Sequence, residues 1–237
     1  MQISPIKTRV FKKRENLFSF VLEHIKNIEE NSVLVVTSKI VALSEGRVVD
    51  YKNERQKDEL IKKESSFALK TKVVWLTIKD GMLLASAGID ESNGDGKLIL
   101  LPKDSFHSAE IIRKKLQKKF KVKNLGILVT DSRLMPLRAG VVGIALGYAG
   151  FKGIKNNIGK KDIFGKILKM SQTDIADGLA TAAVLCMGEA DEKQPLALIA
   201  EAPVIFSQKT NRAELVISLE KDIYAPFFYN LKNEKRK

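Results

Sequence analysis

Cysteine and histidine are scarce in this chain, and their scarcity excludes several kinds of chemistry. Its 237 residues include one cysteine, Cys186, and two histidines, His24 and His107. A lone cysteine cannot form an internal disulfide, which fits a reducing, cytoplasmic environment. Structural zinc sites need several cysteine and histidine ligands, and a Ser-His-Asp triad needs a suitably placed histidine. His24 is expected on an apolar helix face and His107 near a helix start, so zinc and serine-hydrolase chemistry are not expected.

Long apolar runs and several familiar ligand-binding motifs are also missing. The longest nearly uncharged run, residues 139–151, is too short and glycine-rich to span a bilayer, and residues 1–13 lack the apolar core of a signal peptide. The sequence contains no G-x-x-x-x-G-K-[ST], G-x-G-x-x-G or G-x-S-x-G. The stretch DESNGDG is reminiscent of a calcium loop, but Leu101 stands where the bidentate glutamate should be. We therefore expect no membrane span, no P-loop and no EF-hand.

Positive charge is the most pronounced compositional feature that is present. Lysine and arginine outnumber aspartate and glutamate by 41 to 28, which gives a formal net charge of +13. Such a charge attracts polyanions, including nucleic acid, acidic membranes and phosphate-bearing small molecules. The densest basic stretch, RKKLQKKFKVK at residues 113–123, continues a helix whose apolar residues fall near helical spacing. No nucleic-acid-binding motif accompanies it, so a solvated helix face is the favoured interpretation and nucleic acid is not an expected partner.

Apolar periodicity predicts helices and strands that follow one another without strict alternation. Helices are expected at 17–28, at 54–63, from Asp104 or Ser105 through the basic stretch, at about 173–187 with Gly188 as its stop, and at 222–231. Strands are expected at 32–39 (which enters a turn or helix at Ser38), 72–78, 81–89, 97–102, 125–131, 141–147, 195–206 and 213–219. Regular βαβ alternation would predict a doubly wound parallel sheet. The irregular order instead predicts a mixed sheet of the α/β or α+β class.

Three acidic residues follow apolar elements: Asp90, Asp131 and Glu189. At such positions a carboxylate can extend from a rigid element into a loop-lined cleft. With no sulfur or imidazole nearby, these oxygen ligands suit Mg²⁺ or Mn²⁺, ions that are commonly shared with nucleotide phosphates. Ser132 could add a hydroxyl, and the Lys39 ammonium, at a strand end, could reach a phosphate. Taken singly, each acid is more often a turn residue or helix cap, and that interpretation stays open.

Several sequence segments occur in an order known from one family. They are TSKIVALSEGR, AGIDESN, LLP followed by SAEIIR, TDS with PLR, IALGYAG, and GKKDIFGKIL with DIADGLATAAVLCMGEADEKQPLALI. Together, over residues 5–203, they resemble the coenzyme F420 γ-glutamyl ligases, which attach glutamate to a deazaflavin precursor. The resemblance implies a GTP- and divalent-metal-dependent amide ligase with an α+β fold of mixed sheets, built as an intertwined homodimer. It also implies one catalytic domain over residues 1–230, which could comprise two subdomains, and a basic tail at 231–237.

The resemblance assigns metal-binding and catalytic roles to individual residues. Asp90 in GIDESN and Asp131 in TDS would be ligands of a first Mg²⁺ or Mn²⁺. Ser132 and Glu189 would serve a second ion. Arg138, in the PLR segment, would act in catalysis beside Asp90 and Asp131. A monovalent cation would be a further cofactor, and the substrates would be GTP, L-glutamate or a similar amino acid, and a carboxylate acceptor.

The same resemblance places the nucleotide among four segments of the chain. These are residues 8–11, the TSK motif, the DESN motif and the loop 187–194. Transfer of the γ-phosphoryl group of GTP would convert the acceptor carboxylate to an acyl phosphate, which needs positioned charge but no protein nucleophile. The residues assigned to nucleotide contact are Thr8, Arg9, Val10, Phe11, Ser38, Lys39, Asn93, Gly188, Ala190 and Asp191.

The chain departs from the family pattern in segments that are expected to meet the substrates. The family's TDTFGRPWR is TDSRLMPLR here, so Leu134 and Met135 replace a Gly-Arg pair, although Arg138 is kept. Leu43 stands where the family has a lysine, and Gly143 stands where it has an aspartate. The metal-binding acids are kept while substrate-reading residues differ. The alternatives are therefore a related ligase that acts on another carboxylate, and a non-catalytic nucleotide-binding homologue.

Overall fold

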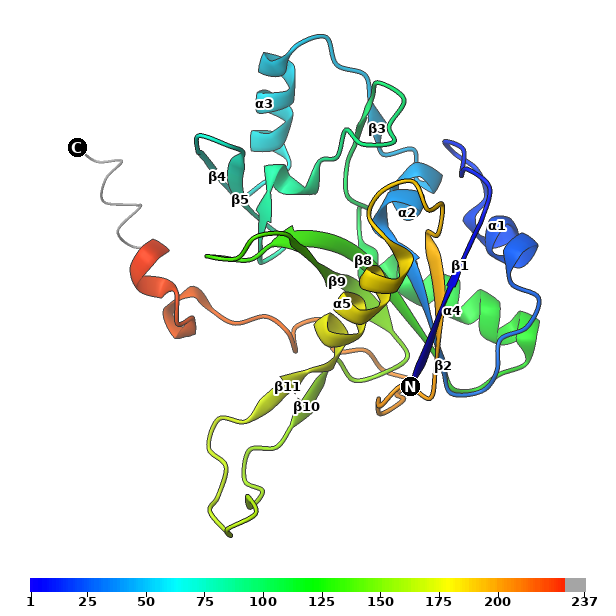
Figure 1. Cartoon of the computed structure of the whole chain (residues 1–237), viewed down its shortest axis with the longest axis vertical. Helices are drawn as coiled ribbons and strands as arrows, with labels where there is room; N and C mark the ends of the chain where they lie inside the picture. The colour runs from blue at the N-terminus through cyan, green and yellow to red at the C-terminus, as the bar shows by residue number, and fades with distance from the viewer. Residues whose placement is uncertain (229–237) are drawn as a thin grey trace.

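A five-stranded mixed sheet forms the centre of the fold. The computed structural model describes residues 1–228 (Figure 1). The strand order is β1-β12-β2-β8-β9, in which β2 and β8 are parallel and the other neighbouring pairs are antiparallel. The predicted mixed α+β class is confirmed. The strands are β1 (Gln2–Ile6), β2 (Ser32–Thr37), β8 (Leu125–Leu134), β9 (Val141–Ala149) and β12 (Leu196–Ala200).

Helices cover both faces of this sheet, and the sequence of β2 explains why. Its apolar side chains alternate between two hydrophobic clusters: Leu34 and Val36 pack with α1 and α4, whereas Val33 and Val35 pack with α5. A strand that is buried on both faces needs such a continuous apolar run. The helices are α1 (Leu17–His24) and α4 (Ser105–Phe120) on one face, and α5 (Ile175–Met187) on the other.

A smaller unit packs beside the end of β8 (cyan in Figure 1). Its apolar contact with the main body joins Leu84 to Leu101, Ile144 and Leu146. The short α2 and the β3–β7 pair connect the unit to the central sheet. The connecting elements are α2 (Ser38–Ser44), β3 (Val48–Val49) and β7 (Leu98–Ile99). The unit itself consists of α3 (Glu54–Lys63), β4 (Phe67–Lys70), β5 (Trp75–Lys79), β6 (Met82–Ala85) and the 3-10 turn η1 (Ser86–Gly88).

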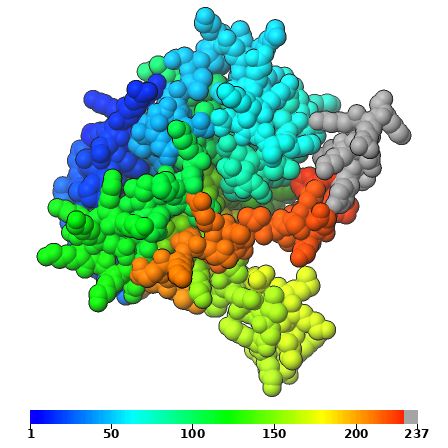
Figure 2. Space-filling view, turned by 180° about the vertical axis from the view of Figure 1, so that it is seen from behind, coloured from blue at the N-terminus to red at the C-terminus, as the bar shows by residue number. Residues whose placement is uncertain are grey.

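A hairpin arm projects from the body. It consists of residues 153–174, with β10 (Ile154–Asn156) paired to β11 (Gln172–Asp174) at its base. Figures 1 and 2 both show the arm standing clear of the rest of the molecule. Its position next to α5 follows from the chain order, because β11 leads directly into that helix.

The segment after β12 runs across the surface of the molecule (orange to red in Figure 2). Glu214 anchors it, because its Oε1 accepts hydrogen bonds from the Tyr148 hydroxyl at 2.5 Å and from the Gly153 N–H at 2.6 Å. Burial and the nearby carboxylate raise the pKa of Tyr148, so the phenol stays a donor at neutral pH. The contact also ties this segment to the base of the arm.

Several predicted elements are confirmed, with differences at their ends. α2 begins at Ser38, α4 is capped by Asp104, whose carboxylate accepts from the His107 N–H at 2.8 Å, and Gly188 (φ 84°) ends α5. The strand expected at 125–131 continues to Leu134, because residues 130–134 pair with β9. The helix expected at 17–28 ends at His24, and the strand expected at 97–102 is reduced to Leu98–Ile99.

Other predictions about elements were wrong or incomplete. The strand expected at 213–219 is absent: residues 213–215 form a turn, residues 216–218 form no regular element, and the 3-10 turn η2 (Leu219–Lys221) begins at the last residue of the range. The strand expected at 195–206 stops at Ala200, and β1, β3, β4 and the arm were not predicted. The end of the helix expected at 222–231 and the tail at 231–237 lie outside the described residues. Within residues 1–228, no helix combines the length and apolarity needed to cross a membrane.

Candidate functional site

The candidate site lies at one edge of the central sheet, where several strand ends meet (Figure 1). β2 and β8 run parallel, with Thr37 paired to Thr130, so the residues that follow this pair lie side by side. They are Lys39 in the first turn of α2, and Asp131 and Ser132 near the end of β8. β12 is antiparallel to β2 and begins at this edge, and β1 ends there. The topology therefore gathers residues that are widely separated in the sequence.

The loops after β1 and before β12 close one side of this edge. The Thr8 N–H donates to the Lys193 carbonyl at 2.8 Å, and the Thr37 N–H donates to the Pro195 carbonyl at 3.0 Å. Thr8 is buried. The segments 8–11 and 187–194, both predicted to line a nucleotide site, are thus held together beside the end of β2.

Asp90 is joined to this edge by an ion pair with Lys39. Lys39 Nζ lies 2.7 Å from Asp90 Oδ2 and donates to the carbonyl and the hydroxyl of Ser92, both at 3.1 Å. The Ser92 N–H and hydroxyl donate in turn to the Asp90 carboxylate at 2.6 and 3.0 Å. Burial acts to raise the pKa of Asp90, but Lys39 and Ser92 together hold it below its ordinary value. Asp90 is therefore ionised at neutral pH.

Glu189 reaches the same edge because α5 packs along β9. The Thr181 hydroxyl donates to the Gly143 carbonyl at 2.8 Å, which fixes the helix against the strand. A Cβ on Gly143 would lie 2.5 Å from the Ala180 carbonyl oxygen, so only glycine permits this close approach. Gly143 pairs with Ser132 on β8. The Ser132 hydroxyl donates to Glu189 Oε1 at 2.6 Å, so the end of α5 meets the end of β8.

Asp131 is partly buried and feels the charge of the other two carboxylates. Burial is the main cause that raises the pKa of Asp131 to about 7, and a hydrogen bond from the Ser132 N–H opposes it. The carboxylates of Asp90 and Glu189 raise this pKa further, whereas the Lys39 ammonium lowers it. Lys39, Asp90 and Glu189 therefore each lie within electrostatic reach of Asp131. That these carboxylates hold a common ligand stays a prediction.

The oxygen atoms at this edge are of the kind that Mg²⁺ and Mn²⁺ prefer. Within residues 1–228, however, no three acidic, histidine or cysteine side chains are close enough together to hold a metal ion. The hydrogen bonds account for this: Asp90 is turned toward Lys39, and Glu189 toward Ser132. A shared ion would require these carboxylates to turn toward a common point. The donor chemistry fits a divalent cation, and the assignment of particular ligands stays a prediction.

The match to one protein family includes all the residues of this site. The family described as F420-0:Gamma-glutamyl ligase matches residues 5–201. The chain belongs to this family. Relatives described as coenzyme F420:L-glutamate ligase occur in Methanococcus maripaludis strain C6 (32% identical, covering 83% of this chain and 86% of the relative) and in Methanocaldococcus jannaschii (31% identical, covering 94% and 96%). The resemblance that the motifs indicated is confirmed.

In this member of the F420-0:gamma-glutamyl ligase family, two predicted nucleotide-contact side chains are engaged elsewhere. The Arg9 guanidinium forms ion pairs with Glu15 and, at 2.8 Å, with Glu23. Phe11 is buried in the core, where its ring packs edge-on against Phe20 at a centroid distance of 4.9 Å. The Phe11 ring is therefore not available to a nucleotide in this arrangement, whereas the Arg9 side chain stays exposed.

Other predicted residues are exposed around the edge or beyond it. Val10, Asn93 and Asp191 are exposed, and Asn93 has a left-handed backbone (φ 54°). Arg138 is exposed in the turn between β8 and β9. Asp131 precedes the end of β8 by three residues, which corresponds to about 10 Å of extended chain. Arg138 therefore belongs to the far end of the hairpin.

Two residues within segments predicted to line the site have contacts that were not predicted individually. Ser92 links Asp90 to Lys39, and its place two residues after an aspartate, the spacing of an Asx turn, was an available signal. Glu192 accepts a hydrogen bond from the Ala190 N–H at 2.8 Å and so shapes the loop before β12. No sequence pattern indicated this role, because it depends on the conformation of the loop.

Proposed function

We propose that this chain is a GTP-dependent ligase that forms an amide bond between L-glutamate and the carboxylate of a deazaflavin precursor. The observation that supports the proposal most is that the chain belongs to the F420-0:gamma-glutamyl ligase family. It is supported further by the Lys39–Asp90 ion pair and by the electrostatic effect of Lys39, Asp90 and Glu189 on Asp131. The net charge of +13 would favour anionic substrates such as GTP.

Formation of an amide from a carboxylate and an amine requires activation, because hydroxide is a poor leaving group. In the proposed reaction a carboxylate oxygen of the precursor attacks the γ-phosphorus of GTP, the bond to the bridging oxygen breaks, and GDP leaves. The glutamate amine then attacks the acyl carbon, loses a proton and expels inorganic phosphate. These steps need aligned reactants and compensated charge, and no protein nucleophile takes part.

Lys39 is the residue best placed to contact phosphate oxygens. Its ammonium lies at the start of α2, with its side chain 27% exposed, so a ligand at the sheet edge can reach it. Asp90, Asp131, Ser132 and Glu189 would hold Mg²⁺ or Mn²⁺, which when bound would neutralise charge on the phosphoryl oxygens. A cation there would also relieve the repulsion between the carboxylates that helps raise the pKa of Asp131.

Calorimetric titration with GTP and Mn²⁺ tests the carboxylate assignment. Asp131→Asn is expected to weaken nucleotide–metal binding by about tenfold or more, because a neutral amide is a poorer ligand for a hard cation. Glu29→Gln is the matched control: Glu29 is exposed and precedes β2, at the opposite end of that strand from Lys39. Equal affinities for wild type and Asp131→Asn would show that the assignment is wrong.

Phosphate release from GTP tests the reaction itself and separates the alternatives. We expect release that requires both the deazaflavin precursor and L-glutamate, and that stops when EDTA removes the divalent ions. Release with a different carboxylate would identify a related ligase. Nucleotide binding without release for any acid–amine pair would identify a non-catalytic homologue.

We also propose that the functional partner is a second copy of the chain, paired through the hairpin arm. The arm carries three apolar side chains with high exposure: Ile163 at 92%, Phe164 at 89% and Met170 at 86%. Exposed apolar groups gathered on one projecting element are typical of an interaction surface. An arm that extends from the body can pack on a neighbouring subunit, which suits an intertwined dimer (Figures 1 and 2).

A further inference from the structure

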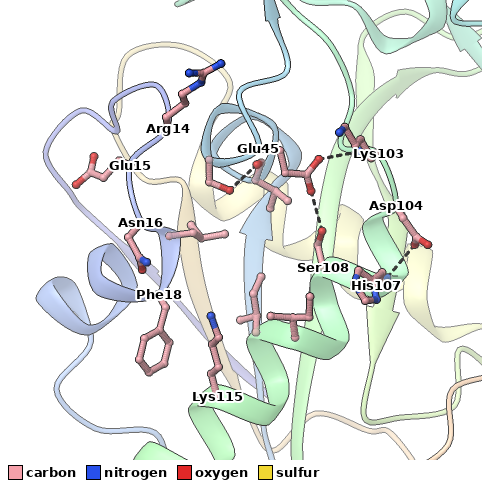
Figure 3. Close-up of a pocket in the computed structure, with 15 residues that line it drawn as sticks. Arg14, Glu15, Asn16, Phe18, Glu45, Lys103, Asp104, His107, Ser108 and Lys115 are labelled. Atoms are coloured by element: carbon pink, nitrogen blue, oxygen red, sulfur yellow. Dashed lines mark hydrogen bonds between the residues drawn. The ribbon is translucent and has the colours of Figure 1, made fainter.

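A hollow in the surface lies away from the sheet edge described above. It has a volume of about 530 Å³ and is bounded by the start of α1, the end of α2 and the first half of α4 (Figure 3). None of the residues predicted for the nucleotide or metal lines it. α2 separates the two places, since Lys39 is in its first turn and Ser44 and Glu45, at its end, line the hollow.

The floor of the hollow is apolar. Leu17, Val41 and Ile112 are buried there, and Ile111 contributes a surface that is 40% exposed. Phe18 adds an aromatic ring at one side. An aromatic or aliphatic group of modest size that lay on this floor would gain the usual free energy of apolar burial.

The acidic residues around the hollow are already engaged with other groups. Glu45 accepts hydrogen bonds from the Lys103 N–H and the Ser108 hydroxyl, both at 2.8 Å (Figure 3). Asp104 accepts from the His107 N–H at 2.8 Å and pairs with Arg212, which lies outside the hollow.

Glu15 is compensated in the same way. It pairs with Arg9 and accepts a hydrogen bond from the Lys12 N–H at 2.9 Å. Arginines therefore balance Glu15 and Asp104, whereas Glu45 is hydrogen-bonded by neutral donors.

The cations around the hollow are not compensated in this way. Arg14, Lys103 and Lys115 line it and are exposed, and within residues 1–228 none of the three forms an ion pair. They come from three different segments and are drawn on different sides of the hollow in Figure 3. Lys115 Nζ lies 5.7 Å from the centre of the Phe18 ring, so a cation and an aromatic face already stand together.

We propose that this hollow binds a small organic anion with an apolar body. The body would rest on Leu17, Val41 and Ile111, and a carboxylate or phosphate would face Lys103 and Lys115. The proposal follows from the combination of an apolar floor, acids that are all hydrogen-bonded or ion-paired within the protein, and three cations without ion pairs in the described part of the chain. It does not depend on the proposed ligase activity. The site is separate from the sheet edge, so the two can be tested independently.

Three matched probes test the proposal by NMR titration of the full chain. Naphthalene-1-acetate and 1-naphthyl phosphate carry the two possible anionic groups, and 1-naphthaleneacetamide is the neutral control with the same ring system. We expect at least one anion to bind about tenfold more tightly than the amide, as one charge-assisted contact allows. The anion that binds more tightly identifies the preferred head group. The chemical shifts of the backbone N–H groups of Leu17, Ser108 and Ile111 are expected to change when an anion binds.

Two double variants distinguish binding in the hollow from nonspecific attraction of anions to a basic protein. Lys103→Gln with Lys115→Gln should weaken anion binding about tenfold and leave the neutral amide unchanged. Lys118→Gln with Lys119→Gln removes the same charge from exposed positions of α4 outside the hollow and should change neither. Ile111→Asp, which places a negative charge on the floor, should abolish binding of the anions.

Three results would overturn the proposal. The anions could bind no more tightly than the amide, the two lysine double variants could weaken binding equally, or the shifts could map to another surface. Failure of GTP binding or turnover would not bear on any of these measurements, because they concern a different surface of the chain.

Discussion

At the scale of the residue, Lys39 connects the loop that carries Asp90 and Ser92 with Asp131 on β8. Its ammonium contacts the Asp90 carboxylate and both oxygens of Ser92, while it also lowers the pKa of Asp131 on the neighbouring strand. We expect Lys39→Ala to weaken GTP binding by about tenfold or more in a calorimetric titration, because a direct contact to phosphate is lost. The free energy of unfolding should fall by less than about 1 kcal/mol, because partly exposed ion pairs contribute little to it.

Lys57→Ala is the matched control for this prediction. Lys57 pairs with Glu91, in the same loop as Asp90 and Ser92, and its side chain is comparably exposed at 22%. Both lysines hold this loop, but Lys57 comes from α3 and not from the sheet edge. If Lys57→Ala lowers the affinity for GTP as much as Lys39→Ala does, the effect comes from anchoring of the loop and not from contact of Lys39 with phosphate.

The residues with charge at the sheet edge could be predicted, but their partners could not. Asp90, Asp131 and Glu189 each follow an apolar element, and parallel pairing of β2 with β8 then brings Asp131 beside Lys39. The choice of partner depends on side-chain rotamers and loop conformations, which leave no periodic pattern. For the same reason Phe11 gave no sign that its ring belongs to the core.

At the scale of the element, the position of Glu189 depends on how closely α5 approaches β9. Gly143→Ala is expected to lower the free energy of unfolding by about 1–3 kcal/mol, because the added methyl group overpacks a close contact. The new Cβ would meet the Ala180 carbonyl oxygen at 2.5 Å and Val184 Cβ at 2.7 Å. Chemical denaturation measures the change.

Gly178 offers a control on the same helix. It lies within α5, and a Cβ added there would meet no atom within 4 Å. Gly178→Ala should therefore raise the free energy of unfolding by about 0.5–1 kcal/mol, because alanine loses less backbone entropy in a helix. If Gly178→Ala lowers the free energy of unfolding as much as Gly143→Ala does, the loss does not come from the close contact at Gly143.

The sequence predicts elements well where burial is two-sided and poorly where it depends on distant partners. β2 and the core of β8 are continuous apolar runs, and both were identified. β1 contains Pro5 and is an edge strand that pairs with β12 alone, so its sequence carries a weaker signal. The segment 213–219 has strand-like alternation, but Glu214 is held by Tyr148 and Gly153 in a turn. That contact spans about sixty residues and leaves no local pattern.

At the scale of the whole molecule, the mixed class could be predicted but the strand order could not. The irregular succession of helices and strands was enough to reject a doubly wound parallel sheet. The order requires pairings such as Gln2 with Ala200, which depend on nearly the entire chain. It is this order that places the ends of β1, β2, β8 and the start of β12 at one edge, and so creates the candidate site.

The hairpin arm leads to a prediction about assembly. The double variant Ile163→Ser with Phe164→Ser is expected to shift the protein from a dimer of about twice 26.4 kDa to a monomer in sedimentation equilibrium. Each such side chain contributes about 1.5–3 kcal/mol when buried, and in a twofold dimer both copies lose it. Val73→Ser is the control, since Val73 is 87% exposed but lies in the turn between β4 and β5. A wild-type monomer, or a double variant that stays dimeric, would contradict pairing through the arm.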